Sequence, residues 1–180
     1  FKVKVPFKGH FCIVTKREPN SINMIRINVL LLFMALVATS AMAQKPMPSP
    51  PDKAEGKIDG ITVTVDYHQP SAKGRKIMGG LVPYGEVWRT GANATTSIEF
   101  SADAKIEGKA IAKGKYALFT IPGENEWTII INKSIKWGSS SYSEGEDVLR
   151  VKVKPSKTDS FVETFNIAVV GSKVVMKWEN

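Results

Sequence analysis

Short runs of alternating apolar and polar residues follow one another along the chain from residue 61 to residue 178. In the clearest run, 61–67, the apolar positions alternate with Thr62, Thr64 and Asp66. Successive side chains of a strand point to opposite faces, so a period of two predicts a strand with one buried face. The other runs that predict strands are 95–100, 103–111 with a Glu107-Gly108 turn, 115–121, 127–132, 148–154, 161–170 and 174–178.

Turn-forming residues separate these runs at short spacing, as Pro122-Gly123 and Gly171-Ser172 do. No segment has a convincing helical period. The pattern predicts an all-β fold, an antiparallel β-sandwich of the jelly-roll or immunoglobulin-like kind, as a single domain over residues 55–180. The aromatic residues expected in its core are Tyr116, Phe119, Trp127, Phe161, Phe165 and Trp178.

Residues 24–43 have the pattern of a secretory signal peptide. Arg26 lies near its start, residues 29–38 are apolar, and Ala41-Met42-Ala43 matches a cleavage site. The apolar run is shorter than the roughly 20 residues that a membrane-spanning helix needs. We therefore expect an exported protein, periplasmic or extracellular, with no membrane span after cleavage.

The segments on either side of the signal peptide are not expected to belong to the folded domain. Residues 1–23 are basic and unpatterned, and we interpret them as an upstream leader that results from a mis-called start. Residues 44–54 are rich in proline and are expected to form an extended linker.

Removal of residues 1–43 changes the charge of the chain. The whole sequence has 25 Lys and Arg against 17 Asp and Glu, a net charge of +8. Six of these basic residues and one acidic residue lie before residue 44, which leaves 19 against 16, or +3. So small a net charge gives no reason to expect a nucleic-acid partner. The single cysteine, Cys12, lies in the removed part, so no disulfide or thiolate metal site is expected.

Histidine is equally scarce, because His68 is the only one after residue 43. This excludes a zinc site with two or three imidazoles, and a Ser-His-Asp triad would need His68 itself. We expect no metal and no cofactor. The pattern identifies no catalytic residue, but Glu86 and Asp147 are the carboxylates to consider for glycan hydrolysis, which needs a pair.

The segment 67–96 has neither a strand nor a helix period and mixes glycine and proline with cationic and aromatic residues. Loops of this kind on a rigid scaffold often bind ligands, and arginine recognises carboxylates and phosphates through paired hydrogen bonds. A second polar and aromatic loop spans 137–142. The candidate ligand-binding residues of the two loops are Arg75, Tyr84, Trp88, Arg89, Asn93, Trp137 and Tyr142.

Two alternatives for these loops remain open at this point. In the first alternative, Arg75 and Arg89 brace the long loop through ion pairs. In the second, the aromatic residues pack the two loops against each other. The candidate partners for such ion pairs are Asp66, Glu86 and Asp147.

Several motifs resemble those of a bacterial secreted family called domain of unknown function 2911. The most distinctive are Trp88-Arg89-Thr90-Gly91-Ala92-Asn93 and Gly80-Leu81-Val82-Pro83-Tyr84-Gly85, and the similarity covers about residues 58–179. Other matching positions are Tyr67, Pro70, Lys73-Gly74-Arg75, Thr95-Thr96, Gly114-Lys115-Tyr116, Ile121-Pro122-Gly123, Trp127, Asn132, Trp137-Gly138, Tyr142, Asp147 and Arg150. Gln69 departs from the arginine that is usual there. The resemblance implies export and an all-β domain, and it implies no activity, substrate or cofactor.

Three hypotheses of function follow. The first is a non-enzymatic domain that binds a polar small molecule, a glycan or an envelope protein through the two loops. The second is a hydrolase that acts on glycan or cell-wall material through Glu86 or Asp147. The third is a purely structural envelope protein, in which the motif residues only fasten the long loop.

Overall fold

The computed structural model describes residues 47–137 and 142–180, which are mostly β-strand and contain no α-helix. All pairs of named strands are antiparallel, so the predicted antiparallel β fold is confirmed at this level. The strands are β1 (Pro51–Ile58), β2 (Ile61–His68), β3 (Ser97–Phe100), β4 (Ala104–Ile106), β5 (Lys109–Ile111), β6 (Gly114–Ile121), β7 (Trp127–Asn132), β8 (Asp147–Val153), β9 (Val162–Val170) and β10 (Lys173–Glu179). A 3-10 turn, η2 (Glu144–Glu146), precedes β8.

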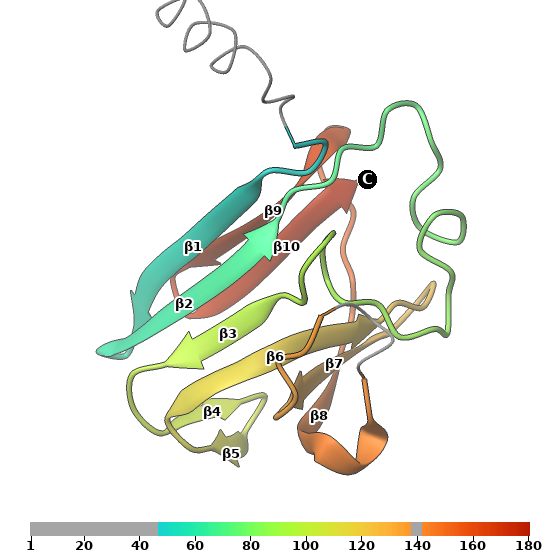
Figure 1. Ribbon diagram of the computed structural model, residues 1–180. Coiled ribbons are helices and arrows are strands. Elements are labelled where there is room, and N and C mark those ends of the chain that lie inside the picture. The colour runs from blue at the N-terminus through green and yellow to red at the C-terminus, as the bar shows by residue number, and fades with distance from the viewer. Residues whose placement is uncertain (1–46, 138–141) are drawn as a thin grey trace, which may run out of the picture. The chain divides into compact units, whose positions relative to one another are not determined.

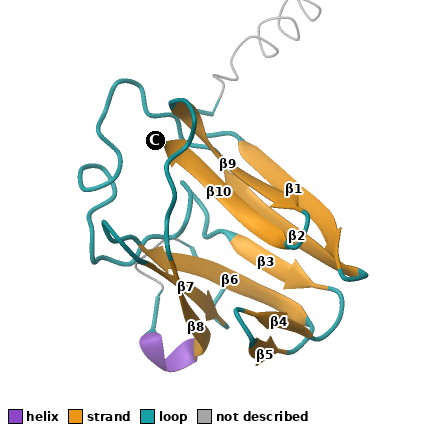
Figure 2. Cartoon of the chain, turned by 180° about the vertical axis from the view of Figure 1, so that it is seen from behind, coloured by secondary structure: helices purple, strands orange, loops and turns teal. Residues whose placement is uncertain are grey.

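Six strands form the main sheet, in the order β1-β2-β3-β6-β7-β8 (Figure 1). The hairpins β9–β10 and β4–β5 form two further sheets of two strands each. In both views β9–β10 lies beside β1 and β2, while β7 and β8 lie farther away from it (Figure 2).

The alternation along β2 is confirmed, because Val63, Val65 and Tyr67 are 3%, 0% and 2% exposed. The neighbouring strand β1 is mostly polar, and its pattern predicts no strand. It begins at Pro51, inside the range expected to be a linker, and pairs with the whole of β2. Proline lacks an N–H group and is tolerated at the start of an edge strand. The extended conformation of β1 is therefore determined by its pairing with β2 and not by its own sequence pattern.

Two of the hairpins turn through a pair of left-handed residues. Asp59 and Gly60 have φ angles of 49° and 82°, and Glu107 and Gly108 have 47° and 78°. Two consecutive positive φ angles are typical of a type I′ turn, whose twist matches that of the strands and which favours glycine at its second position. The predicted turn at Glu107-Gly108 is confirmed.

The main core lies between the six-stranded sheet and the β9–β10 hairpin. Phe165 and Trp178 of the hairpin are buried against side chains of β2, β3, β6, β7 and β8. Phe119 is also buried, while Tyr116 and Trp127 are half-buried at the border of the core. The prediction for Phe161 is wrong, because this residue precedes β9 and its side chain is 51% exposed.

Gly56 allows β9 to approach β1 closely. A Cβ atom at this position would lie 2.7 Å from the Cβ of Val169, closer than real side chains come. The hairpin and the sheet therefore meet tightly at β1, which fixes one edge of the space between the two layers.

The outer face of the main sheet has a second, smaller apolar cluster. Ala117 and Phe119 of β6 and Ile130 of β7 are completely buried there, covered in part by Val87 and Tyr142. The middle of β6 is thus buried on both faces, which agrees with its nearly continuous apolar sequence.

Candidate functional site

The aromatic centre of the long loop, Trp88, belongs to the core. Its side chain is 9% exposed, and its ring stacks on Trp178 at 5.9 Å and meets Phe165 edge-on at 5.2 Å. The backbone of Trp88 exchanges two hydrogen bonds with Thr120 of β6, of 2.8 and 2.9 Å. The indole N–H donates to the carbonyl of Gly91 at 3.1 Å. A ring held in this way has no face left for a ligand.

Buried threonines fasten the same part of the loop. The hydroxyl of Thr96 donates to the carbonyl of Thr90 at 2.7 Å, and that of Thr90 donates to the hydroxyl of Thr120 at 3.2 Å. All three threonines are 0% exposed. Buried polar groups are stable only when they are hydrogen-bonded, so these bonds fix the loop on β6. The sequence reasoning missed their role, although Thr90, Thr95 and Thr96 belong to the motif block.

Arg75 and Asn93 also bond to nearby backbone. The guanidinium of Arg75 donates from Nε to the carbonyl of Ala72 at 2.9 Å and from Nη2 to that of Ser71 at 2.8 Å. Asn93, with a φ of 55°, donates from Nδ2 to the carbonyl of Ser49 at 3.1 Å, which ties the loop to the segment before β1. Both side chains brace the chain locally.

The expected ion pairs of Arg75 and Arg89 do not form within residues 47–137 and 142–180. Asp66 pairs instead with two lysines, and Asp147 pairs with Arg150. The side chain of Arg89 is half-buried, and its Nε has no hydrogen-bond partner among the described residues.

The remaining predicted residues do not share one surface with these. Tyr84 is 40% exposed and lies over Gly79. Trp137 is 73% exposed, and residues 138–141, which follow it in the second predicted loop, lie outside the described residues. Tyr142 packs edge-on against Phe119 on the outer face of the sheet. The seven candidates are therefore a mixture of core, bracing and exposed positions.

Tyr142 belongs to a hydrogen-bonded network at the start of β8. Asp147 accepts from Asn132 Nδ2 at 2.8 Å, from Arg150 Nε at 2.5 Å and from the Tyr142 hydroxyl at 3.0 Å. Arg150 also donates to the Tyr142 hydroxyl and pairs with Glu144 at 3.2 Å. A shift of register between β7 and β8, a β-bulge, lies at this point of the ladder.

This network shifts the pKa values of Tyr142 and Arg150. Burial, together with the carboxylate of Asp147, raises the pKa of Tyr142, because both disfavour the phenolate. The hydrogen bond to Asp147 raises the pKa of Arg150 further. Both oxygens of Asp147 are occupied by neighbouring donors, and Glu86 lies exposed in the long loop. Asp147 and Glu86, the two carboxylates considered for hydrolysis, therefore lie in different environments, one in a hydrogen-bonded network and the other exposed in the long loop.

The departure at Gln69 is also explained by a local network. The hydroxyl of Tyr67 donates to Asp52 at 2.7 Å and accepts the N–H of Ile167 at 3.0 Å, which links β1, β2 and β9. Gln69 donates to the same carboxylate oxygen of Asp52 at 2.8 Å. A neutral amide at this position thus supplies a donor to Asp52, as an arginine would.

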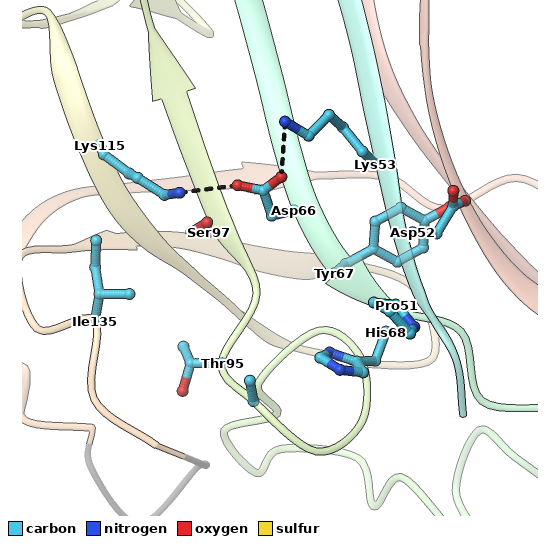
Figure 3. Close-up of a pocket in the computed structure, with 11 residues that line it drawn as sticks. Pro51, Asp52, Lys53, Asp66, Tyr67, His68, Thr95, Ser97, Lys115 and Ile135 are labelled. Carbon is cyan, nitrogen blue, oxygen red and sulfur yellow. Dashed lines mark hydrogen bonds and ion pairs between the residues drawn. The ribbon is translucent and has the colours of Figure 1, made fainter. Parts of the chain in front are cut away.

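An open groove of about 540 Å³ crosses the outer face of β1, β2, β3 and β6 (Figure 3). In its centre Asp66 bonds to Lys115 at 2.8 Å and to Lys53 at 3.4 Å, and the hydrogen bond from Lys115 lowers the pKa of Asp66. His68 and Ser97 also line the groove. Its charges are mutually paired and exposed, as on an ordinary solvated sheet face.

A second and larger cleft, of about 1580 Å³, lies between the main sheet and the β9–β10 hairpin. Its floor is closed, because Val63, Ile131 and Phe165 are 3%, 1% and 1% exposed. Around this floor the cleft is lined by apolar side chains that remain partly accessible, namely Ile58, Ile61, Met78, Ala104, Ile106, Trp127, Ile129, Val174 and Met176. The alternation of apolar and polar residues predicts which side chains face inward. It does not predict that the main sheet and the hairpin are far enough apart to form this cleft.

Residues 47–137 and 142–180 contain neither a metal-ligand cluster nor a helix that could span a membrane. No group of three or more His, Cys, Asp or Glu in this part of the chain is arranged to hold a metal ion. None of its helices has the length and apolar character needed to cross a membrane.

The described residues thus form an antiparallel β domain with a long loop that is fastened to its core. The family described as "Protein of unknown function (DUF2911)" matches residues 49–180, and the chain belongs to it. The matched range contains all ten strands and both networks. No curated protein and no solved structure matches the chain.

Proposed function

We propose that this protein is an exported, non-enzymatic binding domain that holds an apolar ligand in the cleft between the two layers of a β-sandwich. The observation that carries the proposal is the ring of half-buried apolar side chains around the closed floor of the cleft. The signal-peptide pattern of residues 24–43 supports export.

The apolar character of the cleft favours a ligand over an empty space. Apolar surface left in contact with water costs about 25 cal/mol per Å², so a contiguous apolar lining gains free energy when it is covered. Small-molecule sites are concave and mostly apolar, with a few polar groups at their border. The cleft has these properties, whereas the groove at Asp66 is open and ionic.

The position of the loop residues moves the proposed site away from the loop face expected from the sequence. Trp88 is a core residue, while Arg75 and Asn93 bond to backbone carbonyls. These contacts support the structural hypothesis for the loop itself. The hydrolase hypothesis has no such support, because it places Glu86 or Asp147 beside a second carboxylate in a cleft, and neither residue lines the cleft between the sheet and the hairpin.

The proposal can be tested with N-phenyl-1-naphthylamine, a neutral apolar fluorophore whose emission rises in apolar surroundings. Val174 is half-buried and lines the cleft, whereas Val170 of the same hairpin is 61% exposed and does not. Val174→Asn and Val170→Asn therefore form a matched pair. Loss of a partly buried valine contact corresponds to about 1 kcal/mol, or roughly a fivefold weaker affinity.

We expect saturable binding of the dye to the purified protein, unchanged in Val170→Asn and about fivefold weaker in Val174→Asn. Ile129→Asn, on the opposite wall, should weaken it as well. Circular dichroism spectra check that each variant is folded. Absence of saturable binding, or equal affinity in all three variants and the unchanged protein, would overturn the proposal.

A further inference from the structure

One end of the cleft has an excess of cationic side chains. The carboxylate of Glu179, at the end of β10, accepts the backbone N–H groups of Ile77 and Met78, each at 3.1 Å. The carbonyl of Glu179 accepts the hydroxyl of Thr158 at 3.4 Å. The long loop, the segment after β8 and the end of β10 therefore meet around Glu179, next to the C-terminus that is marked in Figure 1. Residues of all three segments line the cleft.

Four exposed lysines line the cleft within these three segments, namely Lys76, Lys154, Lys157 and Lys177. None of them forms an ion pair with the described residues. Lys152, which also lines this end, is neutralised by Glu126 at 2.7 Å. The lining carboxylates here are Glu124 and Glu179. Four unpaired lysine side chains thus face two carboxylate side chains, one of them already held by backbone amides.

The opposite end of the cleft has no such excess. It is formed by the turns after β1 and β9 and by the β4–β5 hairpin, and its lysines are Lys105 and Lys173. Three carboxylates, those of Asp59, Asp103 and Glu107, line the same end. The apolar middle of the cleft therefore lies between a cationic end and an end with slightly more anions than cations.

We propose that the ligand of the cleft is a single-chain amphiphile with an anionic headgroup, whose chain lies along the apolar walls and whose headgroup lies at the lysine-bearing end. This inference depends on the function proposed above, since it names the class of ligand for the same cleft. Lysine binds anions as a mobile point charge, so the headgroup can be a carboxylate or another small anion. The flexible stems of the lysines also extend the apolar walls.

Displacement of bound N-phenyl-1-naphthylamine by three amphiphiles with the same chain tests the inference. The competitors are dodecanoate, dodecanol and dodecyltrimethylammonium, each kept below the concentration at which it aggregates. We expect dodecanoate to displace the dye at a concentration about fivefold or more below that of the other two, as expected from two or three weak interactions between exposed charges. The preference should decrease in 1 M salt, where the screening length is about 3 Å.

A charge-matched pair of double variants assigns the preference to the lysine-bearing end. Lys157→Gln/Lys177→Gln should lose most of the preference for dodecanoate and still bind the dye. Lys57→Gln/Lys133→Gln removes two exposed lysines that do not line the cleft, and should keep the preference.

The outcomes separate this inference from the proposed function. Dye binding with equal displacement by all three competitors would overturn the anionic class and leave the cleft as a binding site. Failure of the dye and of all competitors to bind would overturn both proposals. Sedimentation with phosphatidylglycerol vesicles, without displacement of the dye by dodecanoate, would mean that the lysines recognise an anionic surface and would also overturn the inference.

Discussion

Replacement of Trp88 by alanine tests whether the long loop is part of the core. The indole is 9% exposed, contacts the rings of Phe165 and Trp178, and donates its N–H to Gly91. Truncation of a buried tryptophan costs about 3–5 kcal/mol, because a cavity remains and transfer free energy is lost. At a few degrees per kcal/mol for a domain of this size, we expect Trp88→Ala to lower the melting temperature by roughly 10–20 °C.

A milder variant keeps the test informative if Trp88→Ala does not fold. Trp88→Phe retains an aromatic ring beside Phe165 and Trp178 but leaves the carbonyl of Gly91 without its donor. A lost hydrogen bond in a buried place costs about 1–3 kcal/mol. Thermal unfolding followed by circular dichroism should therefore place Trp88→Phe between Trp88→Ala and the unchanged protein.

Trp137 provides a control with the same chemical change at an exposed position. Its side chain is 73% exposed, and substitutions of such surface residues change the free energy of unfolding by about 0.5 kcal/mol or less. If Trp88→Ala lowered the melting temperature no more than Trp137→Ala does, the indole of Trp88 would not be a core residue. It would then return to the list of candidate ligand contacts.

Three further outcomes follow from the contacts of the described residues. Arg75→Ala removes two hydrogen bonds to backbone carbonyls and should lower the free energy of unfolding in urea by about 0.5–1.5 kcal/mol, with dye binding unchanged. Gly56→Val places a side chain against Val169 and should destabilise the protein by about 1–3 kcal/mol or more in the same assay. The pKa of Asp66 is lowered by Lys115, so this carboxylate stabilises the folded state above its ordinary pKa of 3.8, and that contribution disappears as the pH falls through the lowered value. Asp66→Asn should therefore lower the free energy of unfolding at pH 7 by less than about 1 kcal/mol, because the side chain is 39% exposed, and should leave it unchanged in strong acid.

The strands that the sequence predicts well are those whose burial is regular along their own length. In β2 every second residue faces the core, so the alternation can be read directly. β1 cannot be read in this way, because it is an edge strand that buries Ala54 almost alone and depends on its register with β2. A strand of this kind is determined by a partner elsewhere in the chain.

Binding and bracing roles of the loop residues cannot be separated from the sequence, because the same residue types serve both. The burial of Trp88 depends on Phe165 and Trp178, which are distant from it in sequence. The residues around Trp88 therefore do not predict this contact. The network of Asn132 and Asp147 could have been suspected, because both belong to the motif that carries the family resemblance. Their meeting required the β-bulge between β7 and β8, which a strict period of two does not predict.

The cleft depends on a distance between layers, and this distance is not a property of any single segment. Inward-facing positions are predicted by alternation, but the amount of space between them depends on how closely the hairpin approaches the sheet. Gly56 permits close contact at β1, whereas the lining of the cleft includes residues of β7 and β8 on one side and β10 on the other. The size of such a space therefore follows only from the structure.

The structural role of the long loop and the proposed binding role of the cleft are connected through one segment. Val82 donates to the carbonyl of Ile77 at 2.9 Å, and the carboxylate of Glu179 holds the amides of Ile77 and Met78 at the end of β10. The side chain of Met78 lines the cleft at this point. Because Trp88 fastens the same loop to the core, its loss should loosen the mouth of the cleft as well as the fold. Trp88 can therefore be required for binding without touching the ligand, since it positions the residues that do.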